Sequence, residues 1–255
     1  MDLTGISIVL IASIIAGIVN SVAGSGNLVV YPTLVYLGLS PHQAIATNIA
    51  SVWMGLLTGL ISYRSYFYIT RNILLYFIVP SFVGACIGAY LLLNTPTEKL
   101  KLIVPYLIIF SVIVIAFSNF FENLYSKAVK NYILKVIIVI SVQFLTGVYG
   151  SYFGAGIGLI LLANILFFGI SNFHNANFLK ILLGLLINFT AFSVYIFSEN
   201  IVWFYIPYLA VGYLVGGYLG GYVAQRFKVF YVKIFIIVWG IFVAISYIAR
   251  WRMPS

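Results

Sequence analysis

Long apolar runs alternate with short polar connectors along the whole chain. Eight runs reach the roughly 20 apolar residues that a helix needs to cross the hydrocarbon core of a bilayer. They cover residues 5–23, 43–63, 72–93, 102–118, 133–150, 178–197, 203–224 and 231–249. This pattern predicts an all-α polytopic membrane protein with about eight hydrophobic helices.

Two further apolar runs, 28–37 and 157–168, are only about half that length, and each follows a glycine-rich break. Backbone that leaves helical geometry at membrane depth is tolerated only where it is buried in protein or lines a wet cavity. The two short runs are therefore expected to be half-helical or re-entrant segments in the interior of the protein.

The glycine breaks belong to a sequence repeat. Each break has the form Gly-X-Gly and is followed, after an apolar run, by one of the two histidines of the chain, His42 and His174. The step between the histidines is 174 − 42 = 132 positions. The same step relates Ala44 to Ala176, Thr58 to Thr190 and Gly84 to Gly216. It predicts two homologous transmembrane halves, residues 1–120 and 133–255, joined by a polar linker at 121–132.

The basic residues distinguish two topologies. If all eight long runs cross the membrane, the basic residues other than Lys180 divide seven against five between its two sides. If each glycine-broken unit, 5–38 and 133–169, enters and returns as a hairpin, the division is eight against four, which satisfies the positive-inside rule better. Each half then has an odd number of crossings, and the second half is inverted relative to the first. We favour these inverted repeats, an arrangement that many secondary transporters use.

Composition agrees with a membrane protein and bounds its chemistry. The chain is 64% hydrophobic and 7% charged, whereas a soluble domain is about half apolar and about a quarter charged. The net charge of +9 comes from basic residues scattered over separate connectors, so it indicates contact with anionic membrane lipid rather than with nucleic acid. Cys86 is the single cysteine and lies in an apolar run, so neither a disulfide framework nor a cysteine metal site is expected, and no cofactor is predicted.

The glycine breaks carry the candidate chemistry. Glycine lets the chain turn sharply and leaves backbone N–H groups exposed at the start of the next half-helix. Such a helix start binds anions, because the aligned peptide dipoles place partial positive charge there. No Asp or Glu lies well inside an apolar run, so neither a carboxylate cage for sodium nor a carboxylate proton relay is predicted. The candidate substrate-binding residues around the breaks are Asn20, Gly24, Ser25, Gly26 and Asn27 in the first half and Gly154 and Gly156 in the second.

A polar face continues from each histidine into the following helix. In the first half it comprises His42, Gln43, Thr47 and Asn48, and in the second half His174, Asn175 and Lys180. The two histidines are either interfacial or capping residues, or they contact the anion and act as titratable gates near neutral pH. All of these residues are candidates for binding a small anionic substrate.

Lys180 is the one basic residue inside an otherwise uncharged run from 136 to 198. Cations inside a membrane are costly and normally face a cavity or a partner. In one interpretation the ammonium reaches the headgroups along its flexible stem. In the other, which we favour, it supplies a fixed positive charge to the anion beside the half-helix start at Gly156, facing Asn48 of the first half.

These motifs resemble those of a known family. The run Ala23-Gly24-Ser25-Gly26-Asn27, with Asn20, Pro32, Gly38, Ala44 and Thr47, is similar to the first repeat of the sulfite exporter TauE/SafE family. Residues 147–169 resemble its second glycine-rich repeat, and residues 200–226 resemble the segment that follows. The resemblance implies a multi-pass permease of the cell membrane for sulfur-containing anions, such as sulfite and sulfonates, or for related organic acids. The chain departs from the family pattern at Asn27, Ala163 and Leu179, where a glycine, a proline and a threonine are expected.

The sequence as a whole predicts a secondary transporter that moves a small anion across the cell membrane by alternating access. No Walker-type lysine motif occurs, so ATP is not expected to drive transport directly. A passive anion channel and a purely structural role are alternatives. An intramembrane serine hydrolase, with Ser25 as nucleophile and a histidine as base, is disfavoured because the repeat replaces Ser25 by Ala155 while the glycines persist.

Overall fold

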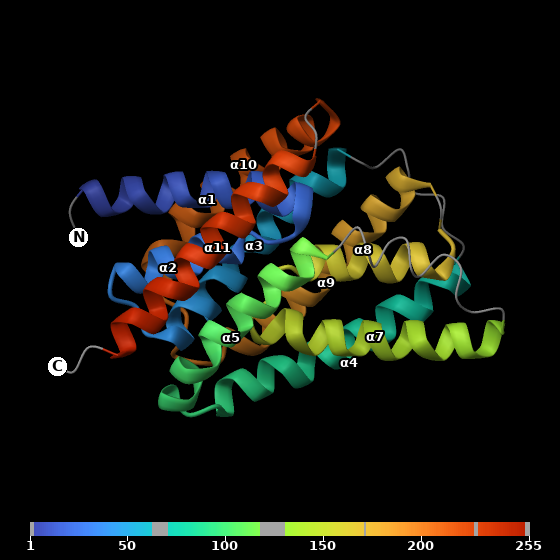
Figure 1. Ribbon diagram of the computed structural model, residues 1–255, viewed down its shortest axis with the longest axis horizontal. Helices are drawn as coiled ribbons and strands as arrows, with labels where there is room; N and C mark the ends of the chain where they lie inside the picture. The colour runs from blue at the N-terminus through green and yellow to red at the C-terminus, as the bar shows by residue number, and fades with distance from the viewer. Residues whose placement is uncertain (1–2, 63–70, 118–130, 171, 227–228, 253–255) are drawn as a thin grey trace.

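The computed structural model describes residues 3–62, 71–117, 131–170, 172–226 and 229–252, and within these ranges the regular structure is entirely helical (Figure 1). In chain order the helices are α1 (Leu3–Ala23), α2 (Asn27–Tyr36), α3 (Pro41–Ser62), α4 (Arg71–Asn94), α5 (Thr97–Ala116), α7 (Tyr132–Tyr152), α8 (Ile157–Phe168), α9 (Phe173–Tyr195), α10 (Ile206–Arg226) and α11 (Val229–Arg252). The predicted all-α fold class is confirmed.

The eight predicted long runs all correspond to helices. Among the described residues, six helices are long and apolar enough to cross a membrane, namely α1, α3, α4, α5, α7 and α9. The last two predicted runs correspond to α10 and α11, and the run at 203–224 begins with a 3-10 turn at Trp203–Tyr205 before α10. The protein is therefore a multi-pass membrane protein, and its short helices α2 and α8 have 10 and 12 residues.

The glycine breaks make hairpins of α1–α2 and α7–α8. In Figure 1, α1 runs from the N-terminal end of the molecule to its centre and α2 returns toward the same end, while α7 and α8 do the same from the opposite end. The tips of the two hairpins touch, because the N–H of Gly158 lies 3.5 Å from the carbonyl oxygen of Gly24. This is the geometry that the hairpin topology requires, whereas the homology of the two halves stays a prediction.

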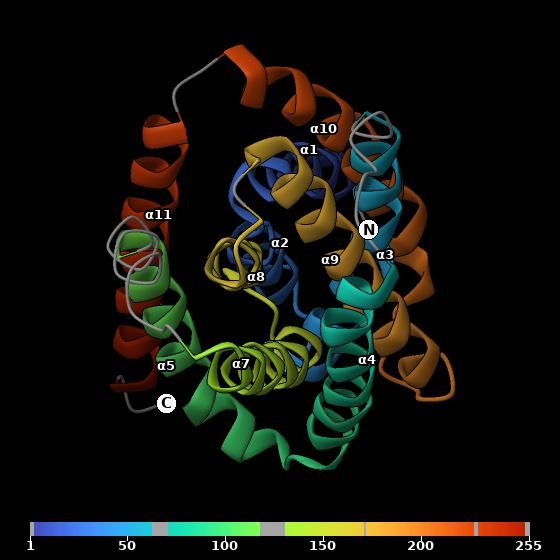
Figure 2. The same ribbon diagram turned by 90° about the vertical axis from the view of Figure 1, so that its right-hand side faces the viewer.

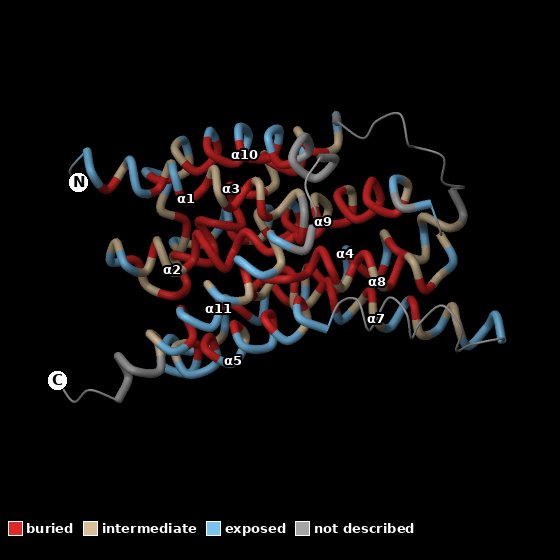
Figure 3. Tube along the Cα trace, turned by 45° about the horizontal axis from the view of Figure 1, so that its top comes forward, coloured by how far each residue is buried: buried red, intermediate tan, exposed pale blue. Residues whose placement is uncertain are grey.

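The two short helices occupy the middle of the bundle. Viewed along the long axis, the longer helices form a ring around α2 and α8 (Figure 2). Burial is concentrated at this centre, and the outer helices expose apolar side chains on their outward faces (Figure 3). Ile11, Val79 and Val238, for example, are 58%, 53% and 63% exposed. An apolar exterior of this kind suits contact with lipid rather than with water.

Glycines let the surrounding helices approach one another closely. α1 packs on α10 at Gly17, where a Cβ would lie 2.8 Å from the backbone of Gly216. α4 packs on α7 in the same way, since a Cβ on Gly84 would lie 2.3 Å from the carbonyl oxygen of Phe144. Small residues at such contacts are a common means of bringing membrane helices together. The close packing of α1 on α10 and of α4 on α7 fixes α1 and α7, the long helices of the two hairpins, in place.

Candidate functional site

The hairpin tips owe their shape to glycine. Gly24, Gly154 and Gly156 have φ angles of 64°, 78° and 80°, a left-handed conformation that other residues adopt only with strain. Gly24 also lies directly against Gly158, and a Cβ on Gly24 would be 2.3 Å from the Cα of Gly158. The two halves therefore meet backbone to backbone at the centre of the molecule.

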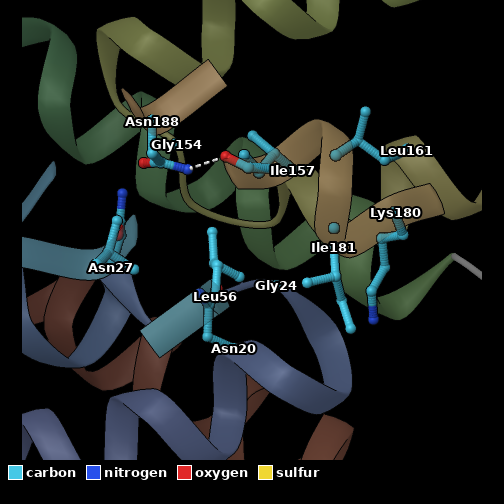
Figure 4. A pocket seen from close by; sticks show the side chains of 13 residues that line it. Asn20, Gly24, Asn27, Leu56, Gly154, Ile157, Leu161, Lys180, Ile181 and Asn188 are labelled. Atoms are coloured by element: carbon cyan, nitrogen blue, oxygen red, sulfur yellow. Dashed lines mark hydrogen bonds between the residues drawn. The ribbon is translucent and has the colours of Figure 1, made fainter. Parts of the chain in front are cut away.

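A small cavity lies beside this contact (Figure 4). Its volume is about 20 Å³, which is room for about one water molecule. Its polar lining comes from Asn20, Asn27, Lys180 and Asn188. Apolar side chains such as Leu56, Ile157 and Leu161 form the rest of the wall, together with the backbone of Gly24, Gly154 and Gly158. Both hairpins thus contribute to one narrow site.

Asn27 connects the tips through a buried chain of hydrogen bonds. Its Nδ2 donates to the carbonyl oxygen of Phe153, in the second glycine break, at 2.6 Å. Its Oδ1 accepts from Nδ2 of Asn48 in α3 at 2.7 Å. The hydroxyl of Tyr213 in α10 donates in turn to Oδ1 of Asn48. Asn48 therefore supports Asn27 from outside the cavity instead of lining it.

Lys180 brings a basic group to the cavity. The residue is 3% exposed, and its Nζ donates to the carbonyl oxygen of Ser21 at 3.2 Å. Ser21 lies in the last turn of α1, where unpaired carbonyl groups and the negative end of the helix dipole favour a cation. The ammonium is thus directed to the first glycine break and not to the membrane surface. It shares the cavity wall with Gly24, whereas the prediction placed it beside Gly156 and facing Asn48.

Two asparagines complete the polar lining. Asn20 lies one residue before Ser21, and its carboxamide has no hydrogen-bond partner among the described residues. Asn188 donates from Nδ2 to the carbonyl oxygen of Gly184 at 2.7 Å. Sequence reasoning missed Asn188, although its spacing of eight from Lys180 places both on one face of the same helix and could have revealed it.

Three predicted residues of the breaks do not line the cavity. Ser25 is fully buried, and its Oγ donates to the carbonyl oxygen of Ala23 at 3.2 Å. Gly26 has a helical φ of −56°, and glycine is needed there because a Cβ would lie 2.6 Å from the carbonyl oxygen of Ala16 in α1. Gly156 lies on the side of Ser111 in α5. These residues shape the tips without lining the site.

The first-half residues after the break stabilise the start of α3. Nε2 of His42, which is buried, lies 2.9 Å from the carbonyl oxygen of Thr95 in the α4–α5 connection. Gln43 and Ser40 cap α3 reciprocally, since Oε1 of Gln43 accepts from the N–H of Ser40 at 3.1 Å, and Oγ of Ser40 accepts from the N–H of Gln43 at 3.3 Å. None of these three side chains lines the cavity between the tips.

Thr47 and the second-half residues also lie outside this cavity. Oγ1 of Thr47 accepts from the N–H of Val202 at 2.9 Å. His174 is exposed at the start of α9, where its N–H and that of Asn175 donate to Oδ1 of Asn172 at 3.0 and 3.2 Å. This is the geometry of a helix N-cap. A role of either histidine in anion binding or gating stays a prediction.

These features together define a class of protein. A multi-pass bundle in which two broken hairpins meet at a buried polar cavity has the architecture of a membrane transporter. The chain matches the family model for the Sulfite exporter TauE/SafE over residues 9–247, and it belongs to this family.

Several relatives of the chain are named as probable membrane transporters. A probable membrane transporter protein of Sinorhizobium, ORF9, is 24% identical over 193 residues, which cover 76% of this chain and 73% of the relative. A probable membrane transporter protein of Haemophilus influenzae is 23% identical over 199 residues, or 78% of this chain and 76% of the relative. The probable membrane transporter protein YfcA of Escherichia coli is 29% identical over 104 residues, or 41% of this chain and 39% of the relative. No solved structure matches the chain.

Proposed function

We propose that the protein is a secondary transporter that binds a small anion between the hairpin tips and moves it by alternating access. The observation that carries this proposal is the amine of Lys180, which lines the cavity while the residue is only 3% exposed. Taking an ammonium out of water costs several kcal/mol, and a bound anion offsets part of that cost. An anionic substrate therefore has a physical reason to bind at this point.

Two side-chain donors line the cavity, namely the Lys180 ammonium and the uncommitted carboxamide of Asn20. The start of α8, where Ile157 lines the wall, lies beside them. Charged oxygens accept stronger hydrogen bonds than neutral ones, and a helix start favours negative charge. A sulfur oxyanion or a carboxylate has the acceptors to use both side-chain donors and the negative charge that suits the helix start.

The closeness of the tips supports a carrier rather than a passive channel. A cavity of about 20 Å³ holds about one water molecule, so an oxyanion enters only when the tips move apart. Because the two hairpins come from opposite ends of the molecule, separation on either side of the Gly24–Gly158 contact would open the site toward one end at a time. A channel would need a continuous path.

The first substrates to test follow from the family. Its description names sulfite, so we propose sulfite, small sulfonates and related carboxylates as candidates. Purified protein is reconstituted into liposomes, and uptake of each labelled anion is measured with and without the same anion inside. Uptake that saturates and is accelerated by internal anion is the expected result for a carrier. Flux that rises linearly with concentration for every anion would overturn the carrier proposal.

The same assay tests the role of Lys180. Lys180→Met removes the charge. Uptake measured at a low substrate concentration should then fall at least about tenfold, because one charge-assisted hydrogen bond is lost. Lys135→Met is the matched control, because the Lys135 ammonium lies over the ring of Phe167, outside the cavity, at 5.8 Å from the ring centroid. Wild-type uptake in both variants would contradict the proposed site.

A further inference from the structure

A second and much larger cavity lies toward one end of the molecule, where α2, the start of α5 and the C-terminal part of α11 come together (Figure 1). Its volume is about 1020 Å³, compared with about 300–1,000 Å³ for typical small-molecule sites. No residue lines both this cavity and the one between the hairpin tips. It is therefore a separate site, and the proposed transport function does not explain it.

The lining of this cavity has two chemically different parts. Where α3 and α5 begin, it is polar and includes Ser40, Gln43, Thr97 and Lys101. Along α2 and α11 it is mainly apolar and aromatic, with Val35, Trp239, Phe242, Val243 and Tyr247. A ligand that fills it must be amphipathic, with a polar group and an apolar part large enough to cover the second wall.

The polar part lies at the depth of lipid headgroups. Near its start, α5 carries Glu98, whose side chain is 75% exposed, and Lys101, whose side chain is 38% exposed, and the two are joined by an ion pair of 3.0 Å. Charged side chains at the end of a membrane helix belong at the membrane interface, not in the hydrocarbon core. The apolar part of the cavity then extends from the headgroup level into the hydrocarbon region.

The cavity is also open to the surface that faces lipid. Tyr36 and Phe242 line it, yet they are 69% and 61% exposed. Ile241 and Ile245, on either side of Phe242 along α11, are 46% and 61% exposed. An acyl chain of the surrounding bilayer can therefore enter sideways without passing through water.

We propose that this cavity binds a glycerophospholipid of the surrounding membrane. Its phosphate contacts Lys101 and Thr97, and its acyl chains lie along Trp239, Phe242 and Val243. Lys101 uses one of its three N–H donors on Glu98, so donors are left for the phosphate. The start of α5 adds the positive end of a helix dipole at the same place. The bound lipid fills the space between α11 and α2.

Native mass spectrometry of the protein in mild detergent, titrated with a diacyl phosphatidylglycerol, tests this proposal. Lys101→Gln should weaken lipid binding about tenfold, because one charge-assisted hydrogen bond is lost. Lys99→Gln is the matched control: it removes the same charge two residues away, from an exposed side chain that does not line the cavity. Inorganic phosphate at the same concentration should not displace the lipid, because the acyl chains supply much of the binding.

A second variant fills the cavity. Ser246→Trp places a large ring in the space along α11 and should remove the lipid that otherwise stays bound through purification. Equal lipid affinity in Lys101→Gln and Lys99→Gln would overturn the proposal. It would also fall if Ser246→Trp kept its lipid but lost anion uptake, since the cavity would then be a vestibule for solute. Native mass spectrometry measures lipid binding in an experiment that involves no transport. A failure of the lipid proposal can therefore be distinguished from a failure of the transport proposal.

Discussion

At the scale of single residues, the site depends on a few polar side chains held in an apolar bundle. Asn27, Asn48 and Tyr213 satisfy one another's hydrogen-bonding groups, and all three are buried. A buried polar group that loses its partner is costly, because water cannot replace it. These hydrogen bonds therefore fix the position of Asn27 at the cavity wall.

Tyr213→Phe tests this chain. The hydroxyl that donates to Asn48 is lost, and Oδ1 of Asn48 is left without that donor, so the variant should be less stable by about 1–3 kcal/mol. The measurement is thermal unfolding of the purified protein in detergent. Tyr218→Phe on the same helix, at a side chain that is 67% exposed, should leave the midpoint unchanged. Equal unfolding midpoints for the two variants would show that the hydrogen bonds between Tyr213, Asn48 and Asn27 do not contribute to stability.

The sequence predicts part of the polar lining of the cavity at this scale. Asn20, Asn27 and Lys180 are polar residues in apolar runs near the glycine breaks, and all three line the cavity, whereas their role in binding stays a prediction. The sequence does not predict where the Lys180 ammonium points, because a long flexible side chain can reach several partners. The carbonyl of Ser21 can accept its hydrogen bond because Ser21 lies in the last turn of α1. Asn188 was overlooked because its partner, the carbonyl of Gly184, lies one turn earlier on its own helix and gives no long-range signal.

At the scale of elements, two glycine-broken hairpins create the site. Length and hydropathy alone predict the long helices and the two half-helices, since helix length is set by membrane thickness. The contact between Gly24 and Gly158 could not be predicted in this way. The repeat pairs Gly24 with Gly156 (156 − 24 = 132), and only tertiary packing decides which backbone atoms of the two tips touch.

Gly24→Ala tests the tip contact. Its Cβ would lie 2.3 Å from the Cα of Gly158, in addition to the strain of a left-handed φ of 64°. Gly38→Ala is the control for strain alone, because Gly38 has a φ of 95° but no atom within 4 Å of the place where its Cβ would lie. Left-handed strain costs about 1–2 kcal/mol, so Gly38→Ala should fold and transport, whereas Gly24→Ala should lose uptake and unfold at lower temperature. Identical behaviour of both variants would mean that the tips do not need to touch.

At the scale of the whole molecule, a ring of long helices surrounds the short helices α2 and α8 (Figure 2), and both hairpins line the small polar cavity at their tips. The outer helices expose many apolar side chains that suit lipid, so the proposed anion site lies in the interior. The two hairpins enter the bundle from opposite ends, as the distribution of basic residues along the sequence predicts. A carrier needs this arrangement to open its site toward one end at a time.

This architecture predicts that the correct anion stabilises the whole fold. A ligand that binds only the folded state at a concentration of 100 times its Kd adds about 2.7 kcal/mol to the free energy of unfolding. A thermal-shift screen of sulfite, small sulfonates and carboxylates should therefore reveal at least one anion that raises the unfolding midpoint in the wild type. The same anion should leave the midpoint of Lys180→Met nearly unchanged. An equal rise in both proteins would place the binding site elsewhere.

Isothermal calorimetry of anion binding to the wild type, Lys180→Arg and Lys180→Met tests the central claim most directly. With the anion found in the screen, affinity should fall about tenfold or more in Lys180→Met, because a charge-assisted hydrogen bond is lost. Lys180→Arg keeps the charge with a different geometry and should retain an intermediate affinity. Equal affinity in Lys180→Met and in the wild type would contradict an anion site between the hairpin tips.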